Sequence, residues 1–149
     1  MSATTRVLQP EDRQQWEELY KGYAEFYGMP MSQETLDQVW KWIFSDDQQF
    51  YCLVACNAEN QLIGLMHYRA MQSPLRGGWV GFLDDLFVSP DARGSGAVDA
   101  LFLALEQSAA GHGWHFVRWI TAEDNYRGQA VYDKVADRTR WVTYQMSAG

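Results

Sequence analysis

The segment Arg93-Gly94-Ser95-Gly96 combines an arginine with two glycines, the residue types of a phosphate-binding bend, and an apolar-periodic helical segment follows it up to Ala109. Glycines let the backbone turn tightly and bring several N–H groups close to a ligand. The first N–H groups of a helix have no partner inside it, and the helix dipole adds positive charge there, so such a bend can bind phosphate. A plain helix-start bend is the alternative, because the third glycine of a dinucleotide-binding motif and the Gly-Lys-Ser/Thr of a P-loop are absent.

Two adjacent aspartates, Asp84 and Asp85, stand inside an otherwise apolar run, Trp79–Val88, which has the composition of a buried strand. Side chains alternate between the two faces of a regular strand, so we expect these carboxyl groups to point to opposite faces. One of them can then face a cleft while the other caps or pairs structurally. Pro90 ends the strand, since proline supplies no N–H to a sheet.

The elements that position these groups follow from apolar periodicity, caps and breakers. In the first half of the chain we expect a strand at 4–8, a helix opened by Pro10 and broken at 28–30, and a helix capped by Ser32. A hairpin of strands at 50–55 and 62–71 and the strand at 79–88 should follow. The rest of the chain should form the long helix stopped at 111–113, a strand at 114–121, a helix from near Asn125 and a final strand at 141–146. This order predicts a mixed α/β layer architecture. The length, without repeats or linkers, predicts one domain, residues 1–149.

The net charge of −7, with only three lysines, disfavours nucleic acid as a partner, because its binding rests on Lys and Arg contacts to phosphate. This charge is compatible with a cationic amine or polyamine substrate, and equally with solubility alone. No apolar run approaches the ~20 residues of a membrane helix and no signal pattern is seen, so we expect a cytoplasmic protein without a membrane segment. Cys52 and Cys56 are expected to be buried free thiols, and no metal site is predicted, since no histidine pair lies near them.

Two ordered blocks resemble motifs of the GNAT superfamily of acetyl-CoA-dependent N-acetyltransferases. The first is Val88–Gly96 followed by a helix, which resembles motif A. The second is Thr121–Lys134, with Asn125 and Tyr132 spaced seven apart. The resemblance covers most of the chain, and is closest to bacterial members similar to polyamine acetyltransferases and histone-acetyltransferase-like proteins. It implies the GNAT fold, an α/β fold with a mixed central sheet whose splayed strands are flanked by helices.

The resemblance also implies where acetyl-CoA binds. In the family, the pantetheine arm enters the gap between two diverging strands and pairs with strand backbone, while the pyrophosphate rests on the glycine bend. The cofactor-binding residues implied here are Leu86, Phe87, Val88, Arg93, Gly94, Ser95, Gly96, Ala97, Val98 and Asn125. The arginine adds charge complementarity to phosphate.

Acetyl transfer requires an amine that loses a proton, a polarised thioester oxygen and a stabilised leaving thiolate. A strand N–H near Val88 can serve the oxygen, and Tyr132 can protonate the sulfur. Asp84 resembles in position an acidic base of polyamine-type members, provided that burial raises its pKa or a water relays the proton. The alternatives are that Tyr132 is an ordinary helix aromatic, and that both aspartates are structural and the amine arrives neutral.

In the resembled family the first two helices wall the acceptor cleft, so Tyr23, Tyr27 and Trp40 could line it together with Asp85; the alternative is that these aromatics are core. His67 is expected to be structural. The function implied is direct transfer of acetyl, in a ternary complex, to a primary amine: a polyamine, a small-molecule amine or a protein lysine. A homodimer that pairs through the final strand is also implied.

The chain departs from the family pattern at three places. Asp91 stands where Gln or Arg is usual, and Val98 stands where glycine is usual, so the pyrophosphate is held less closely. Ala136-Asp137 replaces a glycine–aromatic pair after the last helix, which predicts a shortened final hairpin. The first two departures favour an alternative from another class, a non-catalytic acyl-CoA-binding sensor or interaction module.

Overall fold

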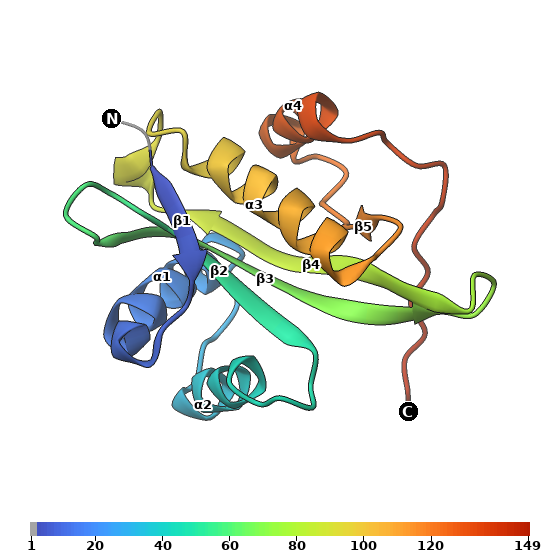
Figure 1. Ribbon diagram of the computed structural model, residues 1–149, viewed down its shortest axis with the longest axis horizontal. Helices are drawn as coiled ribbons and strands as arrows, with labels where there is room; N and C mark the ends of the chain where they lie inside the picture. The colour runs from blue at the N-terminus through green and yellow to red at the C-terminus, as the bar shows by residue number, and fades with distance from the viewer. Residues whose placement is uncertain (1–2) are drawn as a thin grey trace. The chain divides into compact units, whose positions relative to one another are not determined.

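A five-stranded mixed sheet with the order β1-β2-β3-β4-β5 lies at the centre of the first of two compact units (Figure 1). The computed structural model describes residues 3–149, of which the first unit extends to Trp119 and the second spans Ile120–Gly149. The strands are β1 (Thr4–Val7), β2 (Phe50–Cys56), β3 (Leu62–Ser73), β4 (Gly78–Val88) and β5 (Val117–Arg118). Neighbours from β1 to β4 are antiparallel, whereas β5 is parallel to β4 and pairs only with Gly81 and Phe82.

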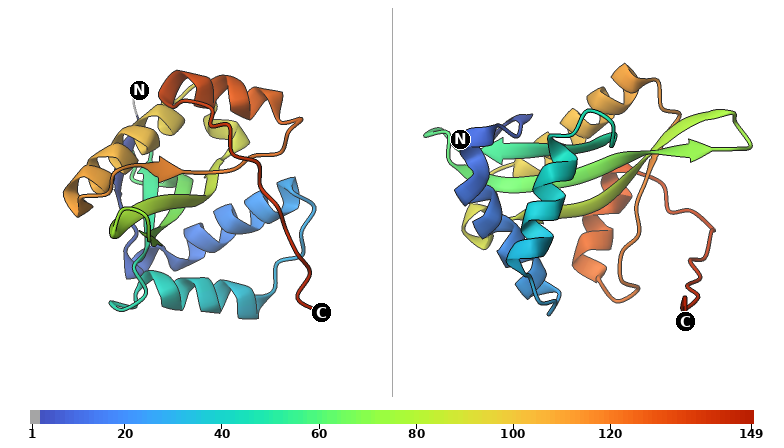
Figure 2. Two further views of the ribbon diagram at one scale, coloured as in Figure 1. Left: turned by 90° about the vertical axis from the view of Figure 1, so that its right-hand side faces the viewer. Right: turned by 90° about the horizontal axis from the view of Figure 1, so that it is seen from below.

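Helices cover both faces of this sheet (Figures 1 and 2). The helices α1 (Arg13–Phe26), which follows the 3-10 turn η1 (Pro10–Asp12), and α2 (Gln33–Ile43) lie on one face. The helix α3 (Ala97–His112), which follows the 3-10 turn η2 (Pro90–Ala92), lies on the other. The cap predicted for α2 is confirmed, since the Ser32 hydroxyl accepts the Thr35 N–H at 3.1 Å.

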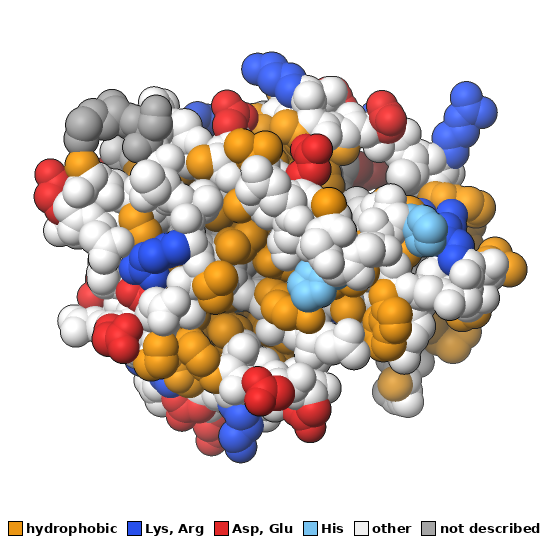
Figure 3. Space-filling model, in the orientation of Figure 1, with side chains coloured by type: hydrophobic (Ala, Val, Ile, Leu, Met, Phe, Trp, Pro, Cys, Tyr) orange, Lys and Arg blue, Asp and Glu red, His pale blue; other side chains and the backbone are white. Residues whose placement is uncertain are grey.

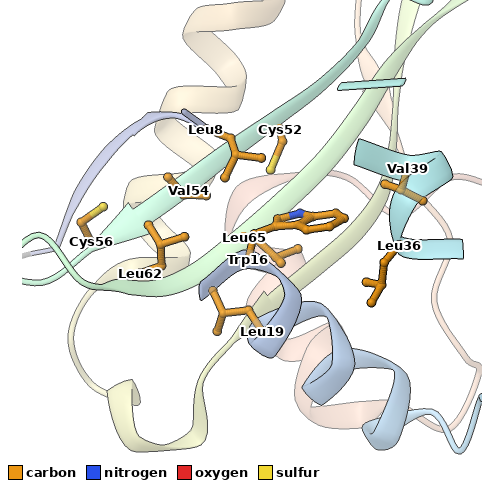
Figure 4. Packing of buried hydrophobic residues seen from close by; sticks show 10 residues of the cluster. All are labelled: Leu8, Trp16, Leu19, Leu36, Val39, Cys52, Val54, Cys56, Leu62 and Leu65. Carbon is orange, nitrogen blue, oxygen red and sulfur yellow. The ribbon is translucent and has the colours of Figure 1, made fainter. Parts of the chain in front are cut away.

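A buried hydrophobic cluster fills the space between the sheet and the α1–α2 layer, with the indole of Trp16 at its centre (Figure 4). Its members are Leu8, Trp16, Leu19, Leu36, Val39, Cys52, Val54, Cys56, Leu62 and Leu65. Burying each large aliphatic side chain stabilises the fold by roughly 1.5–3 kcal/mol. Both cysteines are buried and free, as predicted. This cluster fixes α1 against β3 and β4, the strands that carry the polar residues described below.

The second unit contains α4 (Tyr126–Val135), and residues 136–149 have no helix or strand. The prediction of a final strand at 141–146 is therefore wrong: its alternating apolar residues, Val142, Tyr144 and Met146, are exposed, and no strand of the described residues pairs with them. Apolar alternation does not make a strand without a partner to satisfy the backbone. The homodimer stays a prediction, without the strand on which it was based.

The strand predicted at 114–121 is also shorter than expected, because only Val117 and Arg118 pair with β4. Trp114 is buried by packing its indole against Gly81, where an added Cβ would lie 2.7 Å from the ring. The apolar character of this segment thus reflects packing on the sheet as well as pairing within it.

On the face shown in Figure 3, Lys and Arg side chains are scattered among acidic ones.

None of the helices within residues 3–149 has the length and apolar character needed to cross a membrane. In the same described part of the chain, no three His, Cys, Asp or Glu side chains gather in a way that could hold a metal ion.

Candidate functional site

A β-bulge in β4 places Asp84 and Asp85 on the same face of the sheet. Tyr68 of β3 pairs with Leu83 and the preceding His67 pairs with Asp85, so Asp84 is an extra residue without a partner on β3. A bulge of this kind interrupts the alternation of side chains and re-aims them. The prediction that the two carboxyl groups point to opposite faces is therefore wrong, because the strand is irregular at this position.

Both carboxyl groups line one pocket of about 590 Å³, which we call the aspartate pocket. It lies on the face covered by α1 and α2, and all of its lining residues belong to the first unit. They are Tyr20, Val39, Trp42, Gln48, Phe50, Arg69, Ala70, Asp84 and Asp85. The pocket thus combines aromatic and aliphatic walls with two carboxyl groups and one guanidinium.

Asp85 is held by a buried hydrogen-bond chain. Its Oδ2 accepts the Tyr20 hydroxyl at 2.9 Å and lies 2.9 Å from Nδ1 of the fully buried His67. Nε2 of His67 accepts the indole N–H of Trp16 at 3.0 Å, and because indole only donates, the ring must carry its proton on Nδ1 and donate it to Asp85. Burial alone would raise the pKa of Asp85, but the hydrogen bonds from His67 and Tyr20 outweigh it and hold this pKa below its ordinary value.

Asp84 has the opposite electrostatic character. Burial raises its pKa above the ordinary value, and the Arg69 guanidinium, whose Nε donates to Oδ2 at 3.0 Å, opposes this only in part. The pocket therefore contains one carboxyl group that stays ionised and a neighbour that binds a proton more readily. Two carboxyl groups with pKa values pushed apart in this way suit an anchor for a cation and an acceptor for its proton.

The glycine bend at the start of α3 has an open, left-handed backbone, and its contact with a phosphate stays a prediction. Gly94 and Gly96 both have φ +82°, and a Cβ built on either would meet nothing within 4 Å, so their backbone is open. Gly96 is the N-cap of α3, and the Ser95 hydroxyl accepts the Ala97 N–H at 3.3 Å. Arg93 is exposed beside them. Only glycine adopts this left-handed conformation routinely, so the two glycines fix the course of the bend.

Within residues 3–149, no strand pairs with one edge of the C-terminal half of β4. The N–H of Ser89 donates to Ile63 at the start of β3, and N–H groups alternate along a strand, so the N–H of Val88 points to the opposite edge. On that edge β5 pairs only with Gly81 and Phe82. The backbone from Leu86 to Val88 is therefore available to an extended ligand.

The sequence model of the acetyltransferase (GNAT) family matches residues 16–136, most of the chain. The chain belongs to the GNAT acetyltransferase family. It is an acetyl-CoA-dependent N-acetyltransferase, as the motif resemblance implied, and the alternative of a non-catalytic sensor is set aside.

A D-amino-acid N-acetyltransferase of Saccharomyces cerevisiae is 27% identical over 141 residues, which cover 94% of this chain and 88% of that protein. Among solved structures, a probable acetyltransferase superimposes with a TM-score of 0.84 at 23% identity, covering 100% of this chain and 99% of the other. A ribosomal-protein-alanine N-acetyltransferase of Brucella melitensis has a TM-score of 0.79 at 22% identity, covering 99% and 100%. These structural likenesses confirm the GNAT fold.

The aromatic residues predicted to line the acceptor cleft of this GNAT chain lie around α1 and α2. Tyr23 packs edge-on against Phe87 and beside Tyr27, which is half exposed. Trp40 is partly buried and packs against the core cluster, with its ring tilted on that of Trp16 at 5.2 Å between centroids. These three side chains are absent from the lining of the aspartate pocket, so their predicted contact with the acceptor stays a prediction.

The second motif block of the GNAT chain lies in the second unit. Asn125 caps α4: its Oδ1 accepts the Gly128 N–H at 3.1 Å, and its Nδ2 donates to the Thr121 hydroxyl at 2.9 Å. Tyr132 is half-buried on the same helix. The local structure accounts for the asparagine as a helix cap, while its contact with CoA and the acid role of Tyr132 stay predictions.

Several residues that line or support the aspartate pocket were not predicted as site residues, among them Tyr20, Trp42, Phe50, His67 and Arg69. The signal was present for two of them, because His67 and Arg69 alternate on β3, the strand that pairs with β4. Recognising it requires the register of the hairpin and the position of the bulge. His67 was expected to be structural, and its hydrogen bond to Asp85 links it to the pocket.

Proposed function

We propose that this GNAT chain transfers the acetyl group of acetyl-CoA directly to the primary amine of a small molecule bound in the aspartate pocket. The observation that carries the proposal is the bulge that turns both carboxyl groups of the Asp84–Asp85 pair into one pocket, on the strand that leaves an edge open beyond Phe82. Residues 1–149 would act as a single GNAT domain, since the family match spans both units.

The acceptor enters the pocket as an ammonium ion, and Asp85, whose pKa is held low, stays ionised and binds it. The aromatic walls, Tyr20, Trp42 and Phe50, add cation–π attraction. Asp84, whose pKa is raised by burial, then accepts one ammonium proton directly or through a water. The freed nitrogen lone pair attacks the thioester carbon in a ternary complex, without an acetylated enzyme.

Two further groups complete the proposed transfer. The N–H of Val88, which points to the open edge of β4, donates to the thioester oxygen as negative charge develops on it. Tyr132 donates its phenol proton to the sulfur as the carbon–sulfur bond breaks. The glycine bend at Gly94–Gly96 and the dipole of α3 hold the pyrophosphate, and Arg93 adds positive charge. The attacking nitrogen then loses its second proton, which returns to the phenolate of Tyr132 directly or through water. The products are the acetamide, CoA thiol and the proton carried by Asp84, which is released to solvent.

A small-molecule amine is preferred over the other acceptors that the motif resemblance implies, a polyamine or a protein lysine. A pocket of about 590 Å³ accepts a small ligand whole. The yeast relative acts on D-amino acids, which are small primary amines.

Release of CoA thiol from acetyl-CoA, measured across a panel of amino acids, aliphatic amines, polyamines and lysine peptides, tests this proposal. We expect amine-dependent release that is fastest with small amines, and a fall of about 100-fold or more in kcat/KM in Asp84→Asn. Release only with lysine peptides, or none with any amine, would contradict it. Asp133→Asn, an exposed change on α4, is the matched control.

A further inference from the structure

We infer that the aspartate pocket selects α-amino acids as acceptors, with the guanidinium of Arg69 binding the substrate carboxylate; this inference rests on the proposed function. The pocket places a cation and two carboxyl groups within one cavity, a pattern complementary to a molecule that carries both a carboxylate and an ammonium group. The structure thus narrows the proposed acceptor from primary amines in general to α-amino acids.

The guanidinium of Arg69 has hydrogen-bonding capacity left for a ligand. Its Nε donates to Asp84, while within the described residues no hydrogen bond from its two terminal nitrogens is found. The group lies over the ring of Phe82, with Cζ 5.0 Å from the centroid, and the side chain, which lines the pocket, is 46% exposed. An arginine oriented in this way presents a planar fork that matches a carboxylate with two parallel hydrogen bonds.

Charge distinguishes an amino acid from the other amines. The pocket holds two carboxyl groups, Asp84 and Asp85, against one guanidinium, so it attracts one ammonium group. A second ammonium, as in a polyamine, would face the positive charge of Arg69, and like charges at close quarters are costly. An α-amino acid pairs its ammonium group with Asp85 and its carboxylate with Arg69, so both substrate charges meet opposite ones.

The remaining walls define the space for the amino-acid side chain. Val39, Trp42 and Phe50 supply an apolar surface on the α2 and β2 side of the pocket. An apolar or aromatic side chain would bury its surface there, at roughly 25 cal/mol for each Å² removed from water. We therefore expect phenylalanine or leucine to be better acceptors than aspartate or glutamate.

The test compares three acceptors that differ at the carboxylate: phenylalanine, phenylalaninamide and phenethylamine. Phenylalanine is measured as each of its two enantiomers. We expect wild-type protein to favour one enantiomer of phenylalanine over phenethylamine by about 10-fold or more in kcat/KM, the worth of a charged hydrogen-bond pair. In Arg69→Gln this ratio should fall to near one, and Arg69→Lys should restore part of it. Arg76→Gln, on the β3–β4 loop, is the control that leaves the ratio unchanged.

The ratio of kcat/KM for phenylalanine to kcat/KM for phenethylamine separates carboxylate recognition from a structural effect of Arg69 on Asp84. A structural effect would lower the rates of all three acceptors together and leave this ratio unchanged. Equal rates with the acid, the amide and the amine in wild-type protein would overturn the inference while leaving the proposed function intact. A ratio that survives Arg69→Gln would overturn it as well. If none of the three acceptors, nor any other amine, releases thiol, the proposed function itself fails.

Discussion

Nδ1 of His67 lies 2.9 Å from Oδ2 of Asp85 across the β3–β4 pair, and the other ring nitrogen, Nε2, accepts the indole N–H of Trp16. The histidine is fully buried. The pair has a direct consequence for the proposed anchor: Asp85 owes its low pKa to the hydrogen bond from His67, with a contribution from Tyr20.

Replacing His67 by leucine should raise the pKa of Asp85, because the strongest interaction that opposes burial is lost and only the hydrogen bonds from Tyr20 and Tyr23 remain. The acid limb of the pH profile of kcat/KM should move to higher pH, since a higher pH is needed to ionise the anchor. His67→Asn, whose amide N–H can replace Nδ1–H, should move it less. An acid limb that stays in place in His67→Leu, with the protein folded by circular dichroism, would show that His67 does not tune Asp85.

Asp12 predicts a pH dependence of stability. Its carboxylate accepts from Arg6 at 2.7 and 3.0 Å and from the Gln9 N–H at 2.8 Å, and the hydrogen bond from Arg6 is the main cause that holds its pKa below the ordinary value. The stabilisation is therefore present above the unfolded-state pKa and is lost as the pH falls through the lower folded-state pKa. Asp12→Asn should lower the free energy of unfolding by about 2 kcal/mol near neutral pH.

The difference between Asp12→Asn and wild type should shrink as the pH falls below about 4, where the unfolded chain takes up a proton at Asp12. It should vanish below the lower folded-state pKa, where both proteins carry a neutral side chain at this position. Urea unfolding at a series of pH values measures it. Asp46→Asn, on an exposed turn, is the control and should show little difference at any pH. If the difference in free energy of unfolding between wild type and Asp12→Asn is the same at every pH, the ion pair with Arg6 does not cause it.

Gly96→Asp should weaken acetyl-CoA binding by about 100-fold or more, since it places a negative charge and a side chain where the pyrophosphate is proposed to rest. Gly77→Asp is the matched control: Gly77 also has a positive φ, +62°, and open space around it, but lies in the β3–β4 loop. Calorimetric titration with acetyl-CoA measures both. Equal affinities for the two variants would remove the glycine bend from the binding site.

Tyr132→Phe should lower kcat by about 100-fold while leaving the affinity for acetyl-CoA nearly intact, because only the proton donor is removed. Tyr126→Phe, an exposed tyrosine on the same helix, should retain full turnover. Steady-state thiol release and equilibrium titration together separate the two effects. A full kcat in Tyr132→Phe would assign the protonation of the thiolate to another group.

The sequence was sufficient for the architecture because the relevant signals are local. Ser32 caps α2, Gly96 and Gly113 bound α3, and the apolar runs of β2 to β4 pair with their neighbours along the chain. The final strand at 141–146 could not be judged in this way, since strand formation depends on a partner that local composition does not reveal.

The geometry of the aspartates required the register of two strands. A regular β4 separates Asp84 from Asp85, and a single unpaired residue opposite the His67–Tyr68 step reverses that result. The same register brings Arg69 beside Asp84 and His67 beside Asp85. A pattern with a period of two residues cannot detect one inserted residue, so the shared pocket was outside the reach of sequence reasoning.

The central claim, that both carboxyl groups act on the acceptor from one pocket, is tested most directly by kcat/KM for the acceptor amine in Asp84→Asn and Asp85→Asn, with the acetyl-CoA affinity measured beside it. The account predicts a loss of about 100-fold or more in each variant and an unchanged affinity for acetyl-CoA. Wild-type kcat/KM in either variant would contradict it.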